Sequence, residues 1–203
     1  SSIQTFRDCH KHYYFAYDQC LKPKKPSWAL IDGSNVHLAL ETYYGSTTSQ
    51  NAVEGQPDAK EGHINGIITV LETLYSKETA FEEEERDLHC AMAVGLFKGY
   101  ATIYPPTEFE EYIPEVKFQI DVEHPNLTDK KFVLCGKTDA KIKQNGKPYL
   151  FETKTTSTWS VNDYLARLEL NDQPDTYLYS FNKLGYPALG VLYNVLIKPK
   201  HER

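Results

Sequence analysis

The dipeptide Asn145-Gly146 constrains the fold of this chain more than any other feature of its sequence. Asn-Gly is the pair that a two-residue hairpin turn prefers, because both central residues of that turn have positive φ. The dipeptide separates two stretches, 131–143 and 147–155, in which residue types alternate as they do in strands. We therefore predict an antiparallel hairpin in which Gln144 pairs with Lys147 and each further pair lies one residue outward on both strands.

The predicted register brings charged residues together. Counting outward from the turn, Asp139 pairs with Glu152, so their Cβ atoms should be about 5 Å apart. Lys154 lies on the same face as Glu152, because alternate residues of a strand share a face. Two carboxylates this close repel each other unless a positive charge lies between them. The pattern indicates a metal site with a lysine beside it, and the alternative is a solvent-facing strand whose charges meet by chance.

The elements around this hairpin predict one α+β domain, a mixed sheet flanked by helices. A chain of 203 residues is the right length for a single domain. Apolar spacing, capping residues and Pro or Gly stops predict helices over 2–21, from a cap at Ser34 onward, and over 64–75, 82–100, 163–169 and 172–184 (capped by Asp172), with a loop over 45–62. Further strands are expected over 112–122 and 188–197. Residues 1–105 should therefore be mainly helical, and residues 106–203 should supply the sheet.

Composition restricts the compartment and the class of function. The four cysteines, Cys9, Cys20, Cys90 and Cys135, are widely spread and form no CxxC pair, which indicates reduced thiols in the cytoplasm. No apolar run is long enough to cross a bilayer, and the amino end does not resemble a signal peptide, so we expect no membrane partner. The formal net charge of -6 argues against a passive coat on nucleic acid, which usually carries a basic excess.

Several motifs together resemble one known family. The strings Gly136-Lys137-Thr138-Asp139 and Phe151-Glu152-Thr153-Lys154 resemble the GxxD…ExK core of the PD-(D/E)XK nuclease superfamily. Thr138 stands where the name-giving motif has Pro, as is common in the RecB-like branch. Three further features are similar to that branch: Gly33 to His37 as its GxxxH motif, Gln173 to Tyr177 as its QxxxY motif, and the stretch 1–17, with Cys9 followed by aromatics, as its first helix.

The resemblance spans nearly the whole chain, with the motifs in the expected order, and it looks most like phage-type and RecB-like exonuclease domains. It implies a restriction-endonuclease-like core and a single nuclease domain over 1–203. In that domain, 1–105 carries the His motif, and 106–203 carries the GxxD, ExK and QxxxY motifs.

The resemblance also implies a metal site. Its ligands would be the side chains of His37, Asp139 and Glu152 and the main-chain carbonyl of Thr153. One or two Mg²⁺ or Mn²⁺ ions would bind there, since imidazole beside carboxylates suits manganese as well as magnesium. Iron–sulfur members of the branch need a group of cysteines near the carboxy end, and no cysteine follows Cys135 here, so we expect no cluster.

The remaining motif residues would support the chemistry. Lys154 would orient the attacking water or neutralise charge on the phosphate. Gln173 and Tyr177 are four residues apart, on one helix face, and would support Lys154 and the water, although Tyr177 can equally be a core residue. Glu115, on the strand before the hairpin, would assist from outside the metal ligands. The expected catalytic residues are thus Asp139, Glu152, Lys154, Gln173 and Tyr177.

These features predict a metal-dependent nuclease that hydrolyses phosphodiester bonds of single- or double-stranded DNA. The leading interpretation is an end-dependent exonuclease of recombination or repair, of phage origin or from a bacterial cytoplasm, with a recombination protein as a further partner. A structure-selective endonuclease and a non-catalytic DNA-binding scaffold are the alternatives. The scaffold is disfavoured because Asp139, Glu152 and Lys154 are all present. The negative net charge fits a nuclease, because bound divalent ions can carry the positive field toward phosphate.

Overall fold

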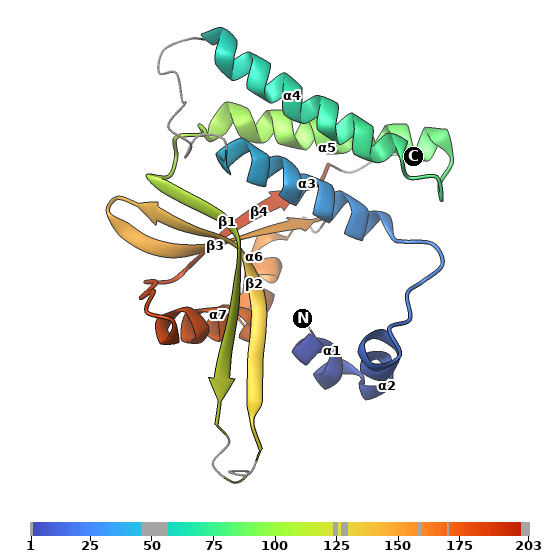
Figure 1. Ribbon diagram of the computed structural model, residues 1–203. Coiled ribbons are helices and arrows are strands. Elements are labelled where there is room, and N and C mark those ends of the chain that lie inside the picture. Colours follow the sequence, from blue (N-terminus) through green and yellow to red (C-terminus); the bar gives the residue numbers. More distant parts are fainter. Residues whose placement is uncertain are drawn as a thin grey trace.

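The computed structural model describes residues 2–45, 57–123, 126, 130–157, 160–169 and 171–199. Its helices are α1 (Ser2–Asp8), α2 (His10–Tyr13), a π-helix (Tyr14–Asp18), α3 (Trp28–Gly45), α4 (Pro57–Ser76), α5 (Glu83–Ile103), α6 (Val161–Glu169) and α7 (Asp172–Lys183). Its strands are β1 (Glu111–Val122), β2 (Phe132–Gln144), β3 (Lys147–Thr156) and β4 (Val191–Ile197). These elements form three layers, with α3, α4 and α5 on one side of the sheet and α6 and α7 on the other (Figure 1).

The four strands form one mixed sheet in the order β1-β2-β3-β4. The first three are antiparallel neighbours, and β4 runs parallel to β3 because the crossover through α6 and α7 returns it in the same direction. This confirms the α+β fold with a mixed sheet flanked by helices.

The β2–β3 turn has the residues and the register that the sequence predicts. Asn145 and Gly146 have φ values of 52° and 73°. The ladder runs from Gln144 opposite Lys147 to Ala140 opposite Phe151. The turn therefore sets which side chains of the two strands share a face.

Two apolar cores lie on the two sides of the sheet. The larger one packs α3, α4 and α5 against Tyr112, Ile142 and Phe151 of the strands. The smaller one packs Phe118 and Leu150 against α7. The site described below lies where the two cores meet along the β1–β2 hairpin.

A bend in β1 lets one hairpin contribute to both cores. Tyr112 and Phe118 are an even number of residues apart, so an undistorted strand would place them on the same side of the sheet. They nevertheless belong to different cores. Between them lies Glu115, a non-glycine residue in a left-handed conformation with φ of 55°. Because that conformation interrupts the regular pleat, β1 changes the core that it faces at this residue.

Several element boundaries differ from those expected. The helix that carries Gly33 and Ser34 begins at Trp28, so these two residues lie inside α3 rather than at its start. The Ser27 hydroxyl accepts a hydrogen bond from the Leu30 N–H at 3.4 Å, and Trp28 packs against the larger core. The added burial of this first turn explains the earlier start.

Three further boundaries also need correction. The segment expected as a loop is helical from Pro57, while its residues 46–56 lie outside the described part. The continuous first helix is instead interrupted at Cys9, where a second short helix begins. The cap of α7 is Asn171, whose side chain accepts from the Gln173 N–H at 2.9 Å, rather than Asp172. Within the described residues, no helix combines the length and the apolar character needed to span a membrane.

Candidate active site

Three carboxylates form a row across β1, β2 and β3. Continued by one residue beyond its last pair, the β2–β3 register places Asp139 opposite Glu152. The β1–β2 register has Pro114 opposite Ala140 and Val116 opposite Thr138, so Glu115 comes opposite Asp139. Such a row of like charges is unfavourable by itself and needs cations nearby.

Each carboxylate of the row has one basic partner. Glu115 pairs with Lys137, which lies two residues before Asp139 on β2. The Asp139 Oδ2 atom lies 3.3 Å from His37 Nδ1. The Lys154 ammonium donates to Glu152 Oε1 at 2.5 Å. The two lysines come from the strands, whereas the histidine comes from the helical layer.

The strands β2 and β3 separate at the row. In a continued ladder Thr153 would exchange backbone hydrogen bonds with Thr138. Instead its N–H donates to Asp139 Oδ2 at 2.7 Å, so the aspartate side chain occupies the gap between the strands. The N–H and carbonyl of one strand residue point to the same side, so the Thr153 carbonyl is also directed toward this gap.

His37 reaches the row because α3 runs close to β3. A Cβ atom on Gly33 would lie only 3.7 Å from Oγ1 of Thr155, which is ordinary contact distance. An alanine would therefore fit at this position, and the distance shows only that α3 passes near β3 at this turn. His37 follows one turn later on α3.

Burial and charge act differently on the two central carboxyls. Burial favours a higher pKa for Asp139, but the hydrogen bond and charge of His37, the Thr153 N–H and the Lys154 charge outweigh it and lower that pKa. Burial and then the charge of Asp139 raise the pKa of Glu152, against the opposing effect of Lys154. Asp139 is therefore the readily ionised member, and Glu152 is held as an anion only at some cost.

Glu152 offers a buried oxygen to a ligand. Its side chain is 4% exposed, and Oε2 has no hydrogen-bond partner among the described residues. A buried carboxylate oxygen without a donor is unfavourable unless something positive binds it. A divalent cation beside Asp139 would supply that charge.

The ligand groups gathered here are of the kinds that bind such a cation, but Lys154 holds one of the carboxylate oxygens. Carboxylate, carbonyl and imidazole groups suit Mg²⁺ or Mn²⁺. In the part of the chain that the structure describes, however, no three His, Cys, Asp or Glu side chains already lie close enough to hold an ion. One Glu152 oxygen is instead held by Lys154 at 2.5 Å. The residues of a metal site are gathered here, but Glu152 is oriented toward the lysine.

A hydrogen-bonded chain holds Lys154 from the α7 side. The Lys154 ammonium donates to the Gln173 side-chain oxygen at 3.3 Å. The Gln173 amide donates to the Tyr177 hydroxyl at 2.7 Å, and that hydroxyl donates to the Lys137 carbonyl at 2.8 Å. The structure thus brings Gln173 and Tyr177 to the same place as the GxxD and ExK residues.

Every candidate residue named from the sequence therefore lies in or beside the row. Glu115 is the least direct, because its side chain contacts Lys137 and is 41% exposed. Lys137 itself was not singled out as a site residue. Its position two residues before Asp139 was the available signal, since alternate strand residues share a face.

The structure adds two more residues to the site. Glu41 lies one turn after His37, and its pKa is raised by burial first, then by Glu115 and Asp139. Tyr193 lies opposite Glu152 on β4, and burial raises its pKa to about 12. The spacing of four between His37 and Glu41 was visible in the sequence, whereas Tyr193 depends on the strand order, which was not.

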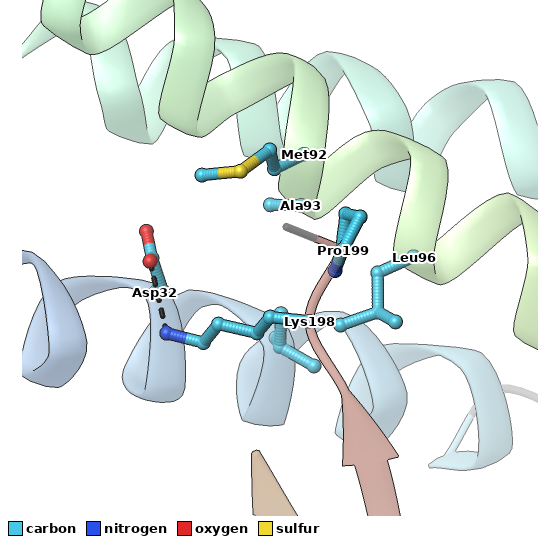
Figure 2. A pocket seen from close by; sticks show the side chains of 7 residues that line it. Asp32, Met92, Ala93, Leu96, Lys198 and Pro199 are labelled. Atoms are coloured by element: carbon cyan, nitrogen blue, oxygen red, sulfur yellow. Dashed lines mark hydrogen bonds and ion pairs between the residues drawn. The ribbon is translucent and has the colours of Figure 1, made fainter. Parts of the chain in front are cut away.

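A second buried polar cluster holds the end of β4 against α3. Asp32 is 5% exposed and accepts hydrogen bonds from Tyr75 at 2.9 Å, His89 at 3.0 Å and Lys198 at 2.9 Å. Figure 2 shows Lys198 extending to the Asp32 carboxylate beside Met92 of α5. Asp32 precedes His37 on the same helix, so this cluster helps to position the histidine relative to the sheet.

Comparison with known proteins gives one match over the whole chain. The family model of the PD-(D/E)XK nuclease superfamily matches residues 1–203. Among solved structures, the chain is similar to SSO0001, with 11% sequence identity, a TM-score of 0.33, and coverage of 80% of this chain and 74% of that chain. It is also similar to protein VC1899 from Vibrio cholerae, with 16% identity, a TM-score of 0.22, and coverage of 81% of this chain and 48% of that chain. No curated protein matches the chain significantly. Structural similarities at this level do not bear on function.

Proposed function

Because the chain belongs to the PD-(D/E)XK nuclease superfamily, we propose that the carboxylate row is the active site of a metal-dependent nuclease that hydrolyses phosphodiester bonds of DNA. The observation that carries this proposal is the unpartnered, buried Oε2 atom of Glu152 beside Asp139 and Lys154. A divalent cation bound to this oxygen and to Asp139 would supply the positive charge that the buried oxygen lacks. Nucleases of this superfamily generally use divalent metals such as Mg²⁺ or Mn²⁺.

We assign the metal-binding role to His37, Asp139, Glu152 and the Thr153 carbonyl. When bound, a divalent ion would lower the pKa of a water molecule and offset negative charge on the phosphate. The remaining roles belong to side chains of the protein. Asp139 remains ionised at neutral pH, because its pKa is lowered, and it fixes the Thr153 backbone through its hydrogen bond.

Lys154 is the group that faces the phosphate in this proposal. Its side chain is 26% exposed, so a substrate can reach it. Its positive charge would stabilise the charge that develops on the phosphate oxygens, or orient the attacking water. Gln173 and Tyr177 hold the ammonium in place, and such preorganised groups are most effective because they need no rearrangement during the reaction.

Substitution of the row tests the proposal. Asp139→Asn, Glu152→Gln and Lys154→Ala should each reduce cleavage of linear DNA by at least about a hundredfold with Mg²⁺ or Mn²⁺, because each removes charge from the reacting centre. His37→Ala should weaken metal binding as well as lower the rate. Matched controls are Glu110→Gln, just before β1, and Lys143→Ala in β2, an exposed pair outside the row. Full activity of the Lys154 variant would assign the chemistry to another place.

We further propose that the enzyme acts from DNA ends, in recombination or repair. The motif pattern resembles exonucleases more than site-specific enzymes. Covalently closed plasmid and its linear form should therefore be compared with the same metal. The linear form is expected to disappear much faster. Equal rates would support the endonuclease alternative instead.

A further inference from the structure

The amino-terminal segment exposes an unusual amount of apolar surface. We call residues 2–26 the N-terminal arm. Its helices α1 and α2 and its π-helix contain no buried residue. Its large apolar side chains are 42% to 60% exposed: Ile3, Phe6, Tyr14, Phe15, Tyr17 and Leu21. Contiguous apolar surface of this kind marks a place where something binds.

Four aromatic side chains of the arm form a row. Phe6 lies on α1, whereas His10, Tyr13 and Tyr17 follow the break at Cys9, so contacts between the rings rather than helical spacing bring the four together. The ring centroids of Phe6 and His10 are 4.2 Å apart, and those of Tyr13 and Tyr17 are 5.0 Å apart, both pairs being stacked. Phe6 and Tyr13 meet edge to face at 5.2 Å. We call these four residues the aromatic row.

The charge of the arm is opposite to that of the chain. Residues 1–26 contain five lysines and arginines against two aspartates, whereas the whole chain contains 22 basic against 28 acidic residues. Lys11 lies 6.0 Å from the centre of the Phe15 ring, so cations are mixed with the exposed aromatics. Flat rings with interspersed cations suit a ligand that offers flat faces and negative charge. Unpaired bases on a phosphodiester backbone have both properties.

The arm also lies beside the candidate active site. Arg7 forms an ion pair with Asp172, at the first residue of α7. Ser2, Ile3 and Gln4 line a cavity of about 100 Å³ together with Gln173 and Tyr177. Gln173 in turn contacts Lys154. In Figure 1 the arm stands next to the β1–β2 hairpin, and Phe118 and Gly136 of that hairpin line the same cavity.

We propose that the aromatic row stacks on the unpaired bases of single-stranded DNA and guides that strand to the active site. The substrate class in this inference rests on the proposed nuclease function, but the binding step can be measured without cleavage. Phe6 is 47% exposed and Tyr17 is 45% exposed although each stacks on a neighbour within the row, so both side chains remain accessible to a base. A backbone that follows the arm toward α1 would come to the cavity that Gln173 lines, next to Lys154.

The direct test measures binding in the absence of metal. Fluorescence anisotropy in EDTA would compare a labelled oligothymidylate of about 20 nucleotides, longer than one single-strand binding surface needs, with a blunt duplex of equal length. The wild-type protein should prefer the single strand. Phe6→Leu and Tyr17→Leu should each weaken that binding about tenfold, because leucine keeps the apolar bulk and loses the stacking face. Tyr17→Phe should bind as wild type.

Tyr179 provides a matched control for these variants. It is 46% exposed on α7, and Lys183 lies 5.7 Å from its ring centre, so it resembles an arm aromatic in exposure and in its nearby cation. Tyr179→Leu should leave single-strand binding unchanged. Since the substituted side chains are all well exposed, the variants should unfold at the wild-type temperature.

The outcomes separate this inference from the proposed function. If the leucine variants lose single-strand binding while no metal supports cleavage, the arm binds DNA and the nuclease proposal is wrong. If cleavage is intact and the leucine variants bind single strands as tightly as wild type, the inference is wrong. It is also wrong if these variants change only the sedimentation of the protein, since the row would then be a contact between copies of the chain. With an active enzyme, the variants should raise KM for single strands and leave kcat unchanged.

Discussion

Tyr177 has two roles, because its ring and its hydroxyl lie in different surroundings. The ring packs edge to face on Phe118 with centroids 5.7 Å apart, inside the smaller core. The hydroxyl belongs to the chain of hydrogen bonds that holds Lys154. The two interpretations open from the sequence, core residue and site residue, are therefore both consistent with its position.

Removing only the hydroxyl should separate these roles. Tyr177→Phe keeps the ring and removes two hydrogen bonds, so Gln173 and Lys154 become less well positioned. We expect kcat on linear DNA to fall about fivefold, which corresponds to a net hydrogen bond of ~1 kcal/mol. The melting temperature should change little. The control is Tyr186→Phe, which loses a 3.1 Å bond to the Ile142 carbonyl away from the row. Equal losses of activity in both variants would contradict a positioning role for Tyr177.

Gly136, the glycine of the GxxD string, is explained by packing. A Cβ atom placed there would lie 2.5 Å from the Phe118 ring. Gly136→Ala should therefore destabilise the fold by about 1–3 kcal/mol, the usual range for overpacking. Urea unfolding measures this change. Phe118→Leu should restore part of the loss in the double variant, because the smaller side chain frees the space. If the two substitutions lower the free energy of unfolding additively, the contact between position 136 and the Phe118 ring is not the cause of the destabilisation.

The sequence predicted the site residues better than their partners. A single turn determined the register, so the pairing of Asp139 with Glu152 followed from the position of Asn145. The partner of Glu115 could not be obtained in this way, because the left-handed conformation at Glu115 is not visible in residue type. Strand alternation with Asp139 could have indicated Lys137, but its contacts with Glu115 and Tyr177 depend on how β1 and α7 pack against β2.

At the scale of elements, α3 shows where local signals failed. Gly33-Ser34 has the composition of a helix start, and Ser34 is a good cap by itself. The tertiary context moves the start to Trp28, whose ring stacks on His89 with centroids 4.0 Å apart. This contact joins residues about sixty positions apart, so local pattern could not reveal it. The same holds for Asp32, whose partners come from α4, α5 and the segment after β4.

The Asp32 cluster should matter more for stability than a surface ion pair does. Asp32→Ala leaves Lys198 and His89 without their buried acceptor, which should lower the free energy of unfolding by about 3–5 kcal/mol. Lys198→Met should cost less, because Tyr75 and His89 still donate to Asp32. Lys25→Met is the control, since its pair with Glu85 is exposed and worth less than about 1 kcal/mol.

Chemical denaturation of the three variants would rank these effects. The order expected from largest to smallest loss is Asp32→Ala, Lys198→Met and Lys25→Met. Because α3 carries both Asp32 and His37, Lys198→Met should also lower the metal affinity of a folded protein. If Asp32→Ala lowers the free energy of unfolding no more than Lys25→Met does, the cluster does not hold α3 in place.

At the scale of the whole molecule, the carboxylate row should be a weak point of the metal-free fold. Burial and Asp139 raise the pKa of Glu152, so the ionised carboxylate favours the unfolded chain over the folded one. Glu152→Gln should therefore raise the melting temperature in EDTA at pH 7, by about 2–4 °C for each kcal/mol gained. Added Mg²⁺ or Mn²⁺ should stabilise the wild type and have much less effect on the variant.

The pH dependence of stability tests whether the raised pKa of Glu152 is the cause of this effect. With a raised folded-state pKa, the wild type regains stability as the pH falls and Glu152 takes up a proton. The difference between the two proteins should therefore shrink in acid. Glu111→Gln, an exposed carboxyl at the start of β1, serves as the control for a general loss of negative charge. A variant less stable than wild type at pH 7 would contradict the repulsion described here.

The bend at Glu115 has a consequence for how this chain can be divided. A helical first half and a sheet-rich second half suggest two modules, with Pro105-Pro106 as the natural place for a cut. The sheet half, however, would expose Tyr112, Ile142 and Phe151 without the helices that cover them. It would also lack His37. The β1–β2 hairpin packs against both cores, so each half of the chain needs the other to complete its packing. Separately produced pieces should regain the carboxylate site only by reassociating.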